Sequence, residues 1–292
     1  MTEAARRPAV AGQFYPKDAD DLAHQLESCF TGPRGPGELP ARHRTPGRFI
    51  RAAVVPHAGF VYSGEIAALA YWAIAGERPP RHVLVLGVDH HGTAETAAIS
   101  VREWNTPLGP VVSDPELASS LRHAPIVVDE AAHRLEHSIE VQLPFLQYVL
   151  PEPTCVELMV PFGPLSFLEE VAGVVRRAVS GRDVLLIAST DFSHYVPAET
   201  ARRLDRMAID RILERDAAGL YETVTSHDIS MCGIAPTTTM LAATQGEELT
   251  AKLLKWGHSG EVESMANVVG YAALLLESRT PLPEELPAPR VK

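Results

Sequence analysis

Short aliphatic runs alternate with longer helical patterns along most of the chain. Four runs have the length and composition of strands buried on both faces: residues 52–56, 82–88, 154–160 and 183–188. Apolar residues recur at helical spacing in five longer segments: residues 64–75, 115–121, 137–150, 165–179 and 199–215. This alternation predicts a sheet that is covered by helices on both faces.

Two further apolar runs, residues 249–257 and 265–276, are candidates for antiparallel strands. We therefore predict an α/β protein with three layers, α/β/α, around a mixed, mostly parallel central sheet. A single domain is expected to span residues 1–279. Residues 32–48 are crowded with proline, glycine and arginine, which favours an exposed connection, and residues 280–292 have the composition of an extended tail.

Histidine or aspartate residues follow three of the predicted strands. His57 comes directly after the first run, His90 and His91 come after the second, and Asp191 and His194 come after the fourth. In open α/β sheets, ligands bind beyond the carboxyl ends of the strands. We therefore expect these side chains to converge on one metal or catalytic centre.

The segment from His133 to His137 matches the pattern H-x-x-E-H. In inverted zinc proteases the two histidines of this pattern bind zinc and the glutamate acts as base. On a helix, the spacing would place His133 with His137, and Glu136 with Glu140, on shared faces. The alternative is a charged helix N-terminus in which His133 is a surface residue, because it does not follow a strand.

Cys232 precedes the apolar helical segment 234–243. The dipole of a helix stabilises a thiolate near its N-terminus, which makes the cysteine a better nucleophile or metal ligand. A buried, inert thiol is the alternative for Cys232. Cys29 lies in a helical pattern and Cys155 in an aliphatic run, and both are expected to pack as small apolar side chains.

The composition narrows the class of protein. The 292 residues are 46% hydrophobic and carry a formal net charge of -11, which argues against nonspecific nucleic-acid binding and against binding to a membrane surface, since both rely on lysine and arginine. Three cysteines do not make a disulfide framework. The longest candidate for membrane insertion, residues 268–276, is too short to span a bilayer. We expect a cytoplasmic protein.

Together, these features resemble the Memo family from near the N-terminus to about residue 276. The motifs that carry the resemblance are PAVAGQFYP at 8–16, PHAGFVYSG at 56–64, LGVDHH at 86–91, TPLG at 106–109, EHSIE at 136–140, STDFSH at 189–194, CG at 232–233 and VGYAA at 269–273. The fold of this family is similar to that of class III extradiol dioxygenases, non-haem iron enzymes that open catechol rings.

The resemblance implies that His57, His90 and Cys232 bind a transition metal. Two imidazoles and a thiolate suit iron or copper, and zinc is also possible. The resemblance places His91 beside these ligands rather than on the metal. Asp89 stands where the family more often has serine, and we expect its carboxylate to orient the ring of His90 as a hydrogen-bond acceptor.

The leading functional hypothesis is a metal-dependent, dioxygenase-like oxidoreductase that acts on a small molecule or on a partner protein. His194 would act as general acid and base, and Asp191 and His137 would orient the substrate or the metal ligands. Ring-opening dioxygenases have a carboxylate where this chain has Cys232. The resemblance also implies an AMMECR-type protein and a radical SAM enzyme as partners, because many bacterial members are encoded beside them.

Two other functions are compatible with the sequence. The first is a non-catalytic scaffold that binds a peptide or a metal, since vertebrate members of the family are linked to receptor signalling and cell motility. The second is a zinc-dependent hydrolase built on His133, Glu136 and His137.

Overall fold

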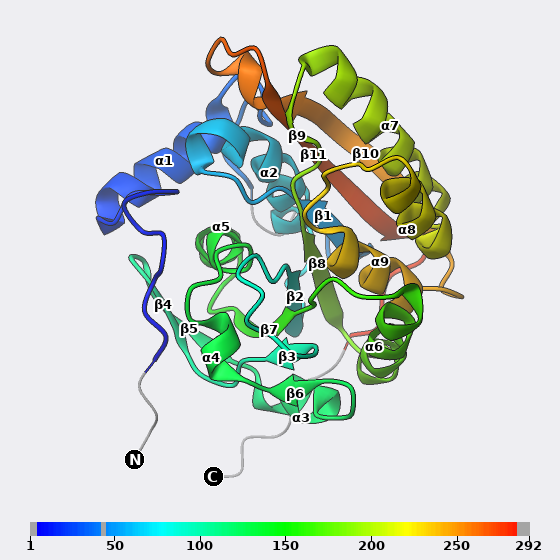
Figure 1. Ribbon diagram of the computed structural model, residues 1–292. Helices are drawn as coiled ribbons and strands as arrows, with labels where there is room; N and C mark the ends of the chain where they lie inside the picture. Colours follow the sequence, from blue (N-terminus) through cyan, green and yellow to red (C-terminus); the bar gives the residue numbers. More distant parts are fainter. Residues whose placement is uncertain (1–4, 42–44, 285–292) are drawn as a thin grey trace.

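The computed structural model describes residues 5–41 and 45–284, in which eleven strands form one mixed sheet between helices (Figure 1). The strands are β1 (Ile50–Val55), β2 (His82–Gly87), β3 (Ala98–Ile99), β4 (Trp104–Thr106), β5 (Gly109–Ser113), β6 (Val127–Val128), β7 (Thr154–Met159), β8 (Val184–Ser189), β9 (His194–Val196), β10 (Leu249–His258) and β11 (Val268–Ser278). The helices are α1 (Ala19–Thr31), α2 (Phe60–Ala75), α3 (Pro115–Leu121), α4 (Glu130–His133), α5 (Leu143–Val149), α6 (Leu165–Val179), α7 (Ala198–Glu214), α8 (Ala217–Ser226) and α9 (Ile234–Ala243). Two 3-10 turns, η1 (Glu140–Gln142) and η2 (Ser259–Glu261), complete the set.

The main path through the sheet has the strand order β10-β11-β1-β8-β2-β7-β3-β6. Its centre is parallel, because β8 pairs in parallel with β1 and β2, and β2 pairs in parallel with β7. Among the described strands, five pairs are parallel and five are antiparallel. The predicted mixed sheet and its late antiparallel strands are confirmed. The expectation of a mostly parallel sheet is wrong, because the β10–β11 hairpin and the short strands add antiparallel pairs.

Alternate residues of the central strands face two separate apolar cores. Ala53 and Val55 of β1 pack on one side in a cluster with α1, α2 and α5. Ala52 and Val54 pack on the other side in a cluster with α6, α7, α8 and α9. Figure 1 shows these two groups of helices on opposite sides of the sheet. Strands with both faces buried explain the continuous aliphatic runs, and the predicted α/β architecture with helices on both faces is confirmed.

The predicted helices are largely present. Helices α3 and α6 have the predicted bounds, and α2 and α7 differ only at their ends. The predicted helix over residues 137–150 is wrong in its first half: η1 and then α5 replace it, and Pro144 lies in the first turn of α5. Proline suits that position because the first turn needs no backbone N–H. Among the described residues, no helix combines the length and apolar composition needed to cross a bilayer.

The described part of residues 32–48 has no helix or strand, and residues 42–44 lie outside the described residues. Arg48 is an exception to the expected exposure, since it is buried. Its guanidinium donates to the buried carboxylate of Asp183 at 2.7 Å, and Arg78 pairs with the same carboxylate. This ion pair holds the connection against β8. The end of the expected tail, residues 285–292, lies outside the described residues.

Glu157 is a fully buried carboxyl on β7. Neither of its carboxylate oxygens accepts a hydrogen bond from the part of the chain that the structure describes. Burial disfavours the charged form and raises the pKa of Glu157 to about 8. The unfolded chain ionises this carboxyl near its ordinary pKa of 4.5, so the folded chain loses stability as the pH rises between the two values.

We predict that Glu157→Gln raises the free energy of unfolding at pH 8 by roughly 3–5 kcal/mol, at about 1.4 kcal/mol for each unit of pKa difference between the two states. At pH 4 the change should be small, because both states then hold the proton. Urea unfolding at the two pH values measures the difference. Glu170→Gln, at an exposed position on α6, is the control. The same pH dependence in Glu157→Gln and in the parent would contradict the prediction.

Candidate metal centre

Three strand ends form one edge of the sheet. Because β1, β8 and β2 are parallel neighbours, their carboxyl ends lie side by side. His57 follows β1, Asp191 follows β8 and His90 follows β2. The side chains of these three residues line one cavity of about 490 Å³ together with His137 and His194. Six residues are predicted to bind the metal or to take part in catalysis, and the structure brings five of them together in this cavity.

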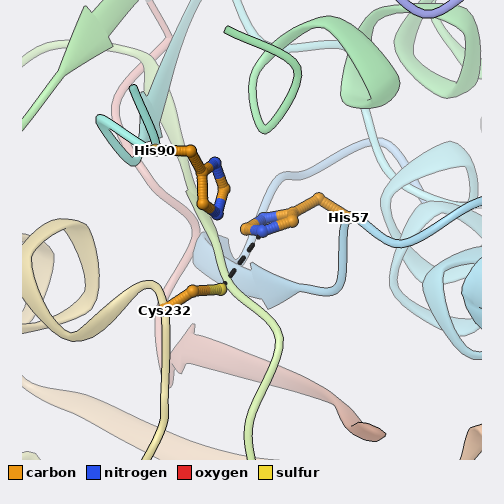
Figure 2. Close-up of side chains that lie close together, drawn as sticks. All are labelled: His57, His90 and Cys232. Carbon is orange, nitrogen blue, oxygen red and sulfur yellow. Dashed lines mark hydrogen bonds between the residues drawn. The ribbon is translucent and has the colours of Figure 1, made fainter. Parts of the chain in front are cut away.

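Cys232, the sixth, reaches this edge from the segment before α9. Its neighbour Gly233 packs so closely on Thr190 that an added Cβ would lie 2.2 Å from the Cβ of Thr190. Only glycine fits that approach. The Sγ atom of Cys232 lies 3.2 Å from Nε2 of His57 (Figure 2). His57, His90 and Cys232 each offer a ligand atom, and these atoms all lie within 4.8 Å of one another.

The hydrogen bonds around His57 fix its tautomer. The Ser189 hydroxyl donates its one proton to the carbonyl of Ser138 at 2.6 Å. It accepts from Nε2 of Gln142, whose amide is oriented by a hydrogen bond from Tyr71 to its oxygen. Nδ1 of His57, 2.9 Å from the Ser189 hydroxyl, must therefore be the donor. Nε2 of His57 therefore carries the lone pair, which faces Sγ of Cys232 at 3.2 Å and can bind a metal once the thiol proton is released.

Glu136 orients the ring of His90 in the same way as Ser189 orients His57, by accepting a hydrogen bond from Nδ1. Nδ1 of His90 donates to Glu136 at 2.9 Å, and the carboxylate also accepts the backbone N–H groups of His90 and Ser138. These donors outweigh burial and hold the pKa of Glu136 well below its usual range. An ionised Glu136 can only accept, so His90 carries its proton on Nδ1 and leaves Nε2 free.

This arrangement corrects the expected role of Asp89. The carboxylate of Asp89 accepts from the backbone N–H groups of Thr93 and Ala94, and so closes its own loop. The acceptor for the His90 ring is Glu136 instead. Exposed His91 contacts the carbonyl of Leu135 through Nε2 at 3.1 Å and takes no part in the cavity lining.

Burial governs the thiol of Cys232. Burial and the nearby carboxylate of Asp191 raise the pKa of Cys232 above its usual value, although the backbone N–H of Asp191 contacts Sγ at 3.2 Å. The expected stabilisation of the thiolate by the dipole of α9 is therefore outweighed. Cys232 is half-buried, whereas Cys29 and Cys155 are fully buried, as expected for apolar packing.

The predicted catalytic residues occupy different environments in the cavity. Asp191 accepts the backbone N–H of His57 at 2.8 Å, and burial raises its pKa to about 6. The ring of His137 stacks on that of His90 at a centroid distance of 4.5 Å, and burial lowers its pKa to about 4. His194 is half-buried, and its Nδ1 lies 2.8 Å from the carbonyl of Ser230. A carbonyl only accepts, so Nε2 of His194 is free to take up a proton.

His90, Glu136 and His137 form a second group of clustered ligand atoms. This group shares His90 with the first, and Glu136 is already saturated by three donors, one of them Nδ1 of His90. A metal there would have to displace these hydrogen bonds. At the group of His57, His90 and Cys232, a metal would displace the contact between the thiol of Cys232 and Nε2 of His57, but it would leave Glu136 and its donors in place.

The predicted helical H-x-x-E-H arrangement is wrong. Helix α4 ends at His133, so the residues up to His137 do not continue with helical spacing. His133 is buried rather than on the surface: its ring packs edge-on against Trp104, and Nδ1 lies 2.8 Å from the carbonyl of Asp129. His133 belongs to neither ligand group among the described residues.

Sequence reasoning gave no role to Ser189 or Gln142, which set the tautomer of His57. Ser189 has a recognisable signal, because it is a polar residue at the end of an otherwise aliphatic strand. Gln142 has none, since its contact with Ser189 spans 47 positions along the chain.

Comparisons with known proteins agree with the motifs. The model of the Memo family, described as Memo-like protein, matches residues 6–275. A MEMO1 family protein of Methanosarcina barkeri is 42% identical over 285 residues, which cover 93% of this chain and 100% of that protein. Another, of Methanopyrus kandleri, is 40% identical over 92% of this chain and 98% of its own. A third, of Ignicoccus hospitalis, is 37% identical over 95% and 99%. The chain belongs to the Memo family.

Proposed function

We propose that the protein binds a transition metal through His57, His90 and Cys232 and is a dioxygenase-like oxidoreductase that acts on a small molecule. The observation that carries this proposal is the shared orientation of the two histidines. Each is held by an acceptor at Nδ1, Ser189 for His57 and Glu136 for His90, and each presents Nε2. Histidine ligands in metal sites are commonly fixed in this way.

The ligand set fits a soft or borderline metal. Two neutral imidazoles and one thiol suit iron, copper or zinc, and binding would release the proton of Cys232. The buried carboxylate of Asp191 lies close enough to raise the pKa of Cys232, so a cation at this point would offset an otherwise unfavourable negative charge. A bound iron or copper ion would supply the redox chemistry of the reaction.

His194 is suited to proton transfer in this cavity. Its Nδ1 is held by the carbonyl of Ser230, which leaves Nε2 as the only basic nitrogen. Imidazole near neutral pH is the commonest general acid and base in enzymes. Asp191 supports the site by holding the backbone of His57, and His137 supports it by stacking on His90.

Aromatic side chains line the rest of the cavity and indicate the class of substrate. Phe14, Tyr62, Tyr195 and Tyr271 share the lining with the histidines. Tyr195 is 77% exposed, and its backbone is left-handed with φ 57°, a conformation that costs a bulky residue energy. A small ring compound would pack against these faces. We therefore propose an aromatic or similarly planar substrate.

Elemental analysis of protein purified without added metal tests the metal centre. We expect a near-stoichiometric amount of iron, copper or zinc in the parent, and its loss in His57→Ala and Cys232→Ala, since each removes one of three ligands. His24→Ala, at an exposed position on α1, and Cys29→Ala, in the apolar core, are controls that should keep the metal. A metal-free parent that also takes up none of the three metals on titration would falsify the proposal.

Glu136→Gln tests the orientation of His90. The amide keeps the shape of the side chain but can no longer accept three hydrogen bonds as a carboxylate does. We expect metal affinity to fall about 10–100-fold. Titration of the metal-free protein with cobalt(II), followed by absorption, measures the affinity, and Glu170→Gln is the control. Unchanged affinity in Glu136→Gln would mean that His90 needs no orienting partner.

His194→Gln separates catalysis from metal binding. We expect this variant to keep its metal and to lose oxygen uptake with aromatic substrates by at least ~100-fold, because the proton acceptor is gone. An oxygen electrode measures the rate, and His123→Gln, at an exposed position, is the control. The metal-loaded parent should also be assayed with a panel of catechols and other small aromatic compounds. If it consumes no oxygen with any of them, the proposed oxidoreductase activity is contradicted.

A further inference from the structure

A second cavity of about 570 Å³ lies beside the N-terminal segment, with none of the clustered histidines in its lining. Four arginines line it: Arg6 and Arg7 from the N-terminal segment, and Arg102 and Arg134 from later parts of the chain. The apolar part of the lining includes Pro8 and Leu135. Figure 1 shows the N-terminal segment passing beside β4 and α4, on the opposite side of the molecule from α7.

The neighbouring residue Arg6 explains why Arg7 is available to this groove. Arg6 is bound into the fold: its backbone pairs alongside Trp104, and its guanidinium lies 3.9 Å above the Trp104 ring and 2.7 Å from the buried carboxylate of Glu140. In an extended segment, successive side chains point in opposite directions. Arg7 is accordingly exposed, and Arg134, directly after α4, is exposed as well.

The charge of the groove is opposite to that of the chain as a whole. The net charge of the chain is -11, yet the charged residues of the described lining are arginines except for one carboxylate, Glu130. Both oxygens of Glu130 accept hydrogen bonds within the fold, from the Ser100 hydroxyl and the Val101 backbone N–H at 2.8 Å each. Neither Arg7 nor Arg134 forms an ion pair with the described residues.

We propose that this groove binds a multivalent organic anion through Arg7 and Arg134. Guanidinium groups recognise carboxylates and phosphates in a planar, bidentate geometry. Leu135 is 53% exposed and provides an apolar wall for the carbon skeleton of the ligand. The volume is in the range of small-molecule sites. The anionic groups can belong to a free small molecule or to acidic side chains of a peptide. This binding does not depend on a metal.

Isothermal titration calorimetry at constant ionic strength tests the proposal with three probes: citrate, tripolyphosphate and a hexaglutamate peptide. We expect the parent to bind at least one of them, and Arg7→Gln and Arg134→Gln each to bind it about tenfold more weakly, because each loses charge-assisted hydrogen bonds. Arg203→Gln, at an exposed position on α7, is the matched control and should bind like the parent. Both groove positions are exposed, so the variants should fold, and circular dichroism checks this.

The pattern of binding identifies the source of the anion. Tighter binding of citrate or tripolyphosphate supports a free small molecule, and tighter binding of hexaglutamate supports an acidic peptide. In either case the loss must be confined to the groove variants. Absence of binding for all three probes, or an equal loss in Arg203→Gln, would overturn the proposal.

Discussion

The hydroxyl of Ser189 can donate only one hydrogen bond, and the carbonyl of Ser138 accepts it. This forces Ser189 to accept from His57, and the orientation of the whole ligand cluster depends on that constraint. If the hydroxyl were free to rotate, His57 could place its proton on either nitrogen, and in one of the two tautomers its lone pair would face Ser189 instead of the ligand cluster. The carbonyl of Ser138 is available because residues 137–139 lie outside a helix, just before η1. The irregular backbone at this point is therefore part of the site.

The segment around Glu136 also connects the N-terminus to the ligand cluster. Glu140 accepts from the backbone of Ala9 and Val10 and from the guanidinium of Arg6, which in turn donates to the carbonyl of Glu136. These contacts are buried, so breaking one partner would leave a charge without compensation. The same short segment therefore orients His90 on one side and holds Arg6, which lines the arginine-rich groove, on the other.

The sequence predicts those parts of the molecule that depend on local pattern. The aliphatic runs identify the central strands, and the polar residues that follow them identify the edge at which His57, His90 and Asp191 meet. The predictions fail where contacts between residues far apart in the sequence determine the structure. Asp89 is adjacent to His90 in sequence, but its carboxylate closes a local turn, and Glu136, 46 positions away, takes its place. The H-x-x-E-H spacing fails because α4 ends within it.

The electrostatics of the cluster favour a cation over a reactive cysteine. A nucleophilic cysteine needs a lowered pKa, whereas burial and Asp191 raise the pKa of Cys232. A thiolate at Cys232 would place a second negative charge beside the buried carboxylate of Asp191, which is costly in a protein interior. A thiolate beside Asp191 is unfavourable without a positive charge and favourable beside one. A positive ion between Cys232 and the two histidines would supply that charge, which is the physical reason to place a metal there.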